Sequence, residues 1–216
     1  TNKAGTSYGE EISFVTLEEG NDEGNEGEED EETKINGYEY VDLGLPSGLK
    51  WASYNVGATS QYEVGEYFSW GELKVKDRYS MDNCSTYGVP MGDFSGDAEY
   101  DVAAFAWGST WRMPTEAEVL ELKNNCTMEW VMIDNDTQGC FVTGPNGNQI
   151  YLPSGGFMTE TNVDFADSEA AYWTSSPDNN EHDQGYATFF YVYNNNFCNR
   201  GWMSRYVGMP IRPVSE

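Results

Sequence analysis

From Lys34 to Glu216 the chain is rich in aromatic residues and is interrupted every few residues by Gly, Pro or Asn. Glycine adopts backbone angles that other residues avoid, and proline has no amide donor, so both tend to end helices and strands. Between these breaks, apolar residues mostly alternate with polar ones, as they do in strands. The sequence therefore predicts an α+β fold with antiparallel sheets, few helices and long loops.

Turn signals place two hairpins in this region. Asn146-Gly147, the stronger signal, lies between residues 140–143 and 149–153, and Pro46-Ser47-Gly48 lies between residues 38–43 and 50–53. Further strands are expected at residues 172–175, 187–193 and 206–214.

Two stretches have the period of a helix, residues 101–107 and residues 116–125. In the second, Thr115 is placed to cap the first turn and Glu118 to complete a capping box. Val119 and Leu122 recur at helical spacing, so we expect this helix to pack on the core.

Acidic residues outnumber Lys and Arg by 37 to 11, which gives a formal charge of -26. Ten of the acids lie in the fifteen residues from Glu18 to Glu32, a run that repels itself and is typical of a solvated spacer. The charge also repels phosphate backbones, so nucleic acid is a poor partner. No apolar run reaches about 18 residues, so no transmembrane segment is predicted in this chain.

The first seventeen residues end in a short alternating stretch in which Ile12 and Phe14 share one face. The string NKAGTSYGEEISFVT at residues 2–16 resembles the closing turn and strand of the fibronectin-type-III-like repeats of exported Bacteroidetes proteins. The resemblance implies that residues 1–17 are the last strand of a preceding domain, that residues 18–33 are an acidic linker, and that residues 34–216 form the next domain.

A second resemblance covers about residues 38–214. Its motifs are YVDLGLPSG (40–48), WASYNVGA (51–58), GEYFSWGE (65–72), WGSTWRMPT (107–115) and GMPIRPV (208–214). In this order they resemble the Fibrobacter succinogenes major paralogous domain family, which is abundant in Bacteroidetes surface lipoproteins. That family is similar to the C-type-lectin-like fold, which formylglycine-generating enzymes and the variable proteins of diversity-generating retroelements share. The resemblance implies a C-type-lectin-like domain at the outer-membrane surface, extracellular and anchored through another part of the parent chain.

Large and scarce side chains in these motifs are expected to be structural. Small neighbours let an indole pack closely against backbone, so the motif tryptophans are predicted in the core rather than on a sugar-binding face. These tryptophans are Trp51, Trp70, Trp107, Trp111 and Trp173. Arg112 and Arg212 are interpreted as structural ion pairs or as clamps on backbone carbonyl groups.

The cysteines give no positive sign of catalysis. Cys84, Cys126, Cys140 and Cys198 leave two alternatives open, namely two disulfides in one of three pairings or free thiols. They lack zinc-ligand spacing, and the single histidine, His182, lies in a polar stretch typical of the surface. Cys198 has no nearby cysteine, so the thiol pair of formylglycine-generating enzymes cannot be carried over, and no catalytic residue is predicted.

No cofactor is predicted. Where calcium-binding C-type lectins have Trp-Asn-Asp, this chain has Trp173-Thr174-Ser175, whose hydroxyl groups are poor calcium ligands. Asp178, Asp183 and the Asp134-Asn135-Asp136 turn keep a calcium site open as an alternative.

The last forty residues combine rigid aromatic side chains with amides, hydroxyl groups and a guanidinium, which is the composition of an adaptable recognition surface. The alternative is a polar loop in which Asn favours turns. In C-type-lectin-like variable proteins the same place carries the ligand surface.

We therefore predict a non-enzymatic binding or adhesion module, which holds an unknown glycan or protein on loops at residues 178–183 and 193–206, at one end of the fold. A formylglycine-generating-like or hydrolytic enzyme and a structural component of a surface appendage remain the alternatives. The predicted ligand-binding residues are Tyr191, Tyr193, Asn194, Asn195, Asn196, Asn199, Trp202, Ser204, Arg205 and Tyr206.

Overall fold

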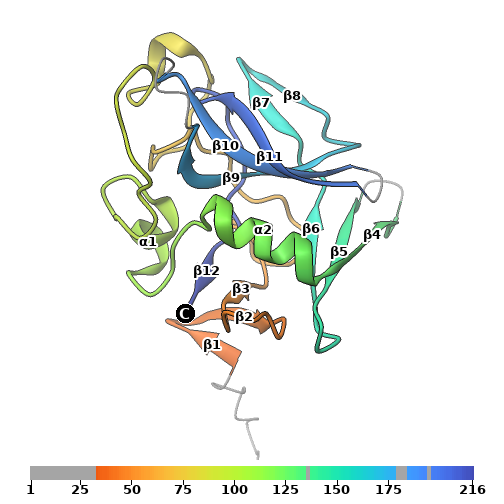
Figure 1. Ribbon diagram of the computed structural model, residues 1–216. Helices are drawn as coiled ribbons and strands as arrows, with labels where there is room; N and C mark the ends of the chain where they lie inside the picture. The colour runs from red at the N-terminus through yellow and green to blue at the C-terminus, as the bar shows by residue number, and fades with distance from the viewer. Residues whose placement is uncertain (1–32, 135–136, 179–183, 194–195) are drawn as a thin grey trace, which may run out of the picture. The chain divides into compact units, whose positions relative to one another are not determined.

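Figure 1 shows a computed structural model of the chain, which describes residues 33–134, 137–178, 184–193 and 196–216, with only the backbone of residues 198–200. The chain divides into Thr1–Glu31 and Glu32–Glu216, and every element below belongs to the second unit. The predicted strand at residues 1–17 and the predicted linker, apart from Thr33, lie outside the described residues.

The described strands pair antiparallel throughout, and with two α-helices they make the predicted α+β fold. One sheet has the order β1-β2-β3-β12, and the others are β4-β5-β6, β9-β10-β11 and the hairpin β7-β8. The strands are β1 (Lys34–Ile35), β2 (Tyr38–Asp42), β3 (Lys50–Ala52), β4 (Thr127–Met132), β5 (Gln138–Thr143), β6 (Gln149–Pro153), β7 (Phe157–Thr159), β8 (Asn162–Asp164), β9 (Ala170–Pro177), β10 (Tyr186–Tyr193), β11 (Asn196–Ser204) and β12 (Val214–Ser215).

Both expected helices are confirmed. α1 spans Val102–Trp107 behind Asp101, whose carboxylate accepts from the amides of Ala103 and Ala104. α2 spans Glu116–Asn125 and begins with the predicted capping box, in which Thr115 and Glu118 each accept from the other's backbone amide. A short 3₁₀ helix also spans Met81–Asn83.

The β9-β10-β11 sheet lies between two hydrophobic clusters. Successive residues of a strand face opposite sides, so Trp173 and Phe189 pack in one cluster while Tyr172 and Phe190 pack in the other. Helix α2 covers the second cluster and contacts all three strands (Figure 1). Burial on both faces explains why the first four residues of β9 and all but one residue of β10 are apolar or aromatic rather than alternating with polar residues.

The five tryptophans predicted in the core are all buried. Three of them also use the indole N–H to bind backbone of distant segments. Trp70 donates to the carbonyl of Thr174 at 2.9 Å, Trp111 to that of Ile35 at 2.9 Å, and Trp173 to that of Phe68 at 3.0 Å. Each indole therefore fixes a strand or loop as well as filling volume.

The two arginines take the structural roles predicted for them. Arg112 forms a two-point ion pair with Glu118, with N–O distances of 2.9 and 2.6 Å. Arg212 is fully buried and donates to the carbonyl groups of Ala52, Ser53 and Tyr151 and to the side-chain oxygen of Asn55. Burial lowers the pKa of Arg212 to about 10, so it remains protonated at neutral pH.

The strand predicted at residues 206–214 is wrong. Only Val214 and Ser215 form a strand there, β12, and the residues before it make isolated bridges such as Phe68 with Met209 and Met158 with Gly208. Pro210 and Pro213 have no amide donor, so a continuous ladder cannot form. The strands β4, β7 and β8 and the two-residue β1 were not predicted.

Replacing Arg212 with Lys keeps the charge but removes the planar fork that serves four acceptors. We expect unfolding free energy to fall by about 3 kcal/mol, or roughly 6–12 °C in Tm, because buried carbonyl groups lose their donors. Urea and thermal unfolding measure this. Arg78→Lys, at a half-exposed position, is the control and should change stability by less than about 0.5 kcal/mol.

Stability should also depend on pH through Glu118. Burial alone would raise the pKa of Glu118, but the ion pair with Arg112 and the hydrogen bonds from Thr115 lower it below its ordinary value. The carboxylate therefore contributes stability above its unfolded pKa of about 4.3, and this is lost as the pH falls through the lower folded pKa. Glu118→Gln should cost about 2 kcal/mol at pH 7 and progressively less below pH 4. Urea unfolding of both proteins from pH 7 to 3 tests this, and a difference that does not change with pH contradicts it.

Candidate functional site

The residues predicted as a binding loop lie mainly in a strand. β10 and β11 form a hairpin in which Tyr186 pairs with Ser204, Thr188 with Trp202, and Tyr193 with Asn196. The loop predicted over residues 193–206 is therefore wrong for residues 196–204. The many polar residues gave no strand signal in the sequence. β11 is an outer strand of its sheet, where few side chains need to be apolar.

The hairpin separates the predicted residues into two groups. Tyr193 and Asn196 lie at its turn, whereas Trp202, Ser204 and Tyr206 lie near the start of β10. An eight-residue strand is roughly 26 Å long, so a small ligand cannot contact both groups. The expectation of one surface at one end of the fold is corrected accordingly.

Two further predicted residues have structural positions. Tyr191 is half-buried, packs against the first core cluster and stacks on Phe189 with ring centroids 5.5 Å apart. Arg205 is only 1% exposed, so its predicted role in contacting a ligand is wrong. Asn194, Asn195, His182 and Asp183 and the side chains of Asn199 and Cys198 lie outside the described residues.

Trp202 is the most distinctive of the residues that remain. All seven tryptophans lie in the described ranges, and Trp202 alone has most of its surface in solvent, with 62% exposed. Its indole stands edge-on to Tyr186, with ring centroids 5.5 Å apart and an interplanar angle of 86°. The strand holds the indole on a rigid base, which lowers the entropy lost when a partner binds.

A second aromatic pair lies beside it in the chain. Tyr206 packs against Tyr87, with ring centroids 5.7 Å apart. We name the pair Tyr186 and Trp202 the Trp202 surface. Tyr87 and Tyr186 were missed by sequence reasoning, and Tyr87 carries no signal in the sequence that connects it with residues more than ninety positions away.

Arg205 binds the backbone near both pairs. Its guanidinium stacks on Trp70 at 4.2 Å and donates to the carbonyl groups of Tyr186 (3.0 Å), Thr86 (3.1 Å) and Val89 (2.7 Å). The same region is joined by backbone bonds, from Trp70 to the carbonyl of Arg205 and from Gly88 to that of Gln184. Arg205 is therefore a positioning residue that fixes residues 86–89 against the hairpin.

The described cysteines carry free thiols, and none of Cys84, Cys126 and Cys140 is in a disulfide. Burial raises the pKa of Cys126 to about 11 and that of Cys140 to about 12. Reactive thiols have lowered pKa values, because the thiolate is the nucleophile.

The alternative of a calcium site finds few ligands in the described chain. Asp134 accepts from the amide of Thr137 at 2.8 Å, and Asp178 is half-buried at the end of β9. Within the described ranges, no group of three or more His, Cys, Asp or Glu side chains is placed to hold a metal ion.

Among the described residues, no helix is long and apolar enough to cross a membrane.

Comparison of the chain with family models, with curated proteins and with solved structures gives no match.

Replacing Trp202 with Ala should leave the fold intact. Because the indole is mostly in solvent, we expect a change in unfolding free energy below about 1 kcal/mol, whereas Trp173→Ala, in the core, should cost about 3–5 kcal/mol. Urea unfolding of the two variants measures both effects. Equal losses would mean that Trp202 is a structural residue and that the Trp202 surface is misassigned.

Proposed function

We propose that the chain is a binding or adhesion module rather than an enzyme, displayed outside the cell, and that it holds a glycan or protein ligand on the Trp202 surface. We also propose that the domain is C-type-lectin-like and related to the major paralogous family. The support for this assignment is the run of five motifs in the sequence, together with β12 pairing to β3, which brings the start and end of the domain into one sheet.

The observation that carries the proposal is the exposure of Trp202. Leaving a large indole in water forgoes the roughly 1.5–3 kcal/mol that burying a large apolar side chain contributes. The other six tryptophans of this chain are buried or half-buried, so the fold has the means to cover indoles. An exposed indole on a strand, edge-on to Tyr186, is suited to sugar rings, which stack on flat faces, and to protein hot spots.

Two of the four cysteines, Cys126 and Cys140, also argue against a thiol enzyme. A thiol enzyme needs a stabilised thiolate, and the pKa of Cys126 and that of Cys140 are shifted in the opposite direction. The Trp202 surface itself is made of aromatic rings, and the buried Arg205 donates to the carbonyl of Tyr186. Such a surface offers contact area to a ligand.

The proposal is tested by binding of the purified protein to glycan and surface-protein arrays. We expect reproducible binding to one ligand class. Trp202→Ala should weaken it at least thirtyfold, which is about 2 kcal/mol or more, because hot-spot aromatic residues carry most of the binding energy.

Phe105→Ala is the matched control, since Phe105 is 60% exposed but lies on α1, away from the hairpin. The two variants should have the same melting temperature as the parent within a few degrees. No reproducible binding would favour a structural component of an appendage, and equal losses in both variants would remove Trp202 from the site.

A further inference from the structure

Two neighbouring hollows lie along the irregular segment between β3 and α1. The first, with a volume of about 570 Å³, and the second, of about 490 Å³, share Ser85 and Tyr100 in their walls. Each volume falls within the range of about 300–1,000 Å³ that is usual for ligand sites. We name the two together the Tyr100 groove, and Tyr87, Tyr186, Trp202 and Tyr206 do not line it.

The walls of the groove offer apolar surface to a ligand. Leu73 lines the first hollow, Met91 and Phe94 line the second, and the ring of Tyr100 borders both. Phe94 is buried against Trp70, with ring centroids 4.5 Å apart, so this part of the groove rests directly on the core. Burial of an apolar side chain here would remove water from already ordered surfaces.

The first hollow is balanced in charge. Glu72 accepts from the amide and the hydroxyl group of Ser85, at 2.8 and 2.7 Å, and it pairs with Lys76. Burial would raise the pKa of Glu72, but Lys76 and Ser85 lower it, so the pair is ionised and fixed in the wall. Lys74 and Glu99, both exposed, add one charge of each sign.

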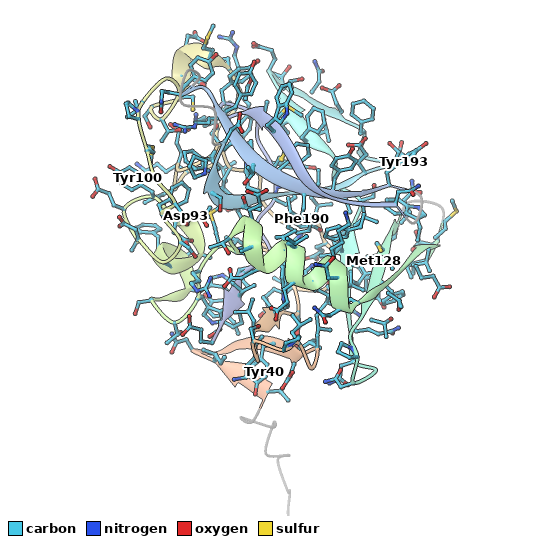
Figure 2. All side chains as sticks on the ribbon, viewed as in Figure 1. Tyr40, Asp93, Tyr100, Met128, Phe190 and Tyr193 are labelled. Carbon is cyan, nitrogen blue, oxygen red and sulfur yellow. The ribbon has the colours of Figure 1, made fainter. Side chains whose placement is uncertain are left out.

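The second hollow is acidic. Asp93 and Asp97 line it, both are exposed, and no Lys or Arg is among its lining residues. Asp93 is held in place because it accepts from the hydroxyl groups of Ser175 and Ser176 on β9. Figure 2 shows Asp93 and Tyr100 on the same side of the molecule. A chain with a formal charge of -26 also attracts cationic partners at long range.

We propose that the Tyr100 groove binds an extended peptide segment that places an apolar side chain in the first hollow and a Lys or Arg side chain in the second. In an extended chain, side chains two residues apart leave the same face about 6–7 Å from each other, which suits two hollows with a common wall. The cationic group meets Asp93 and Asp97, and its stem lies against the ring of Tyr100. This site is independent of the ligand proposed for the Trp202 surface.

The methionines of the chain supply a direct probe. Met91 lines the groove, Met203 lies next to Trp202 in β11, and Met132 is exposed at the end of β4. The full chain, labelled with ¹³C in its methionine methyl groups, is titrated with acetyl-Gly-Phe-Ser-Lys-Gly-amide at low salt. We expect the Met91 signal to move and saturate while those of Met132 and Met203 stay in place.

Two control peptides and two double variants make the test specific. Replacing Lys by Glu or Phe by Ala in the peptide should weaken binding at least tenfold. The combination Asp93→Asn with Asp97→Asn should raise the dissociation constant about fivefold, since each exposed ion pair contributes little. Glu129→Gln with Asp167→Asn removes two exposed acids that do not line the groove and should leave the constant unchanged.

A Met91 signal that does not move overturns the proposal, as does equal movement of all three signals, which would mean diffuse attraction to an acidic protein. Equal binding of the Glu peptide, or equal losses in the two double variants, also overturns it. None of these outcomes bears on the effect of Trp202→Ala in the arrays, so the two proposals fail separately.

Discussion

Buried charged side chains that serve as backbone partners hold this fold together. Residues 53–101 contain one short 3₁₀ helix and no extended strand, so the amides and carbonyl groups that this segment buries must find partners outside a regular ladder. Arg212 takes carbonyl groups at its beginning, Arg205 takes those of Thr86 and Val89 in its middle, and Asp101 accepts from the amides of Gly96 and Met113 at its end. Without these three groups the segment would bury unsatisfied polar atoms, which cost about 1–3 kcal/mol each.

The same interactions connect the core with the surfaces proposed for binding. Arg205 stacks on Trp70, which packs on Phe94 at the base of the Tyr100 groove. The guanidinium also fixes residues 86–89, which lead from Tyr87 to the groove wall at Val89. One buried cation thus positions both sites, although its side chain is almost inaccessible to a ligand.

Local signals in the sequence were sufficient for the elements that depend on them. Thr115 and Glu118 marked the start of α2, and Asn146-Gly147 marked the β5-β6 turn, because caps and tight turns are decided within a few residues. β11 pairs with its neighbour in the chain, β10, and its composition gave no strand signal because an outer strand needs few apolar side chains. The contact between Tyr87 and Tyr206 joins residues far apart in the chain, which local composition does not encode. Arg205 was misassigned for the same reason, since its acceptors come from residues 86, 89 and 186.

A fold held in this way separates the residues that support it from those that are free to meet a partner. The supporting contacts run inward, from guanidinium and carboxylate groups to main-chain atoms, and main-chain atoms are the same whatever side chain a loop residue carries. The side chains of Trp202, Asp97 and Glu99 are exposed, and the backbone contacts of Arg212, Arg205 and Asp101 do not involve these three side chains. Exposed side chains of residues 53–101 and of the outer strand β11 should therefore tolerate substitution with the smallest loss of stability in this domain.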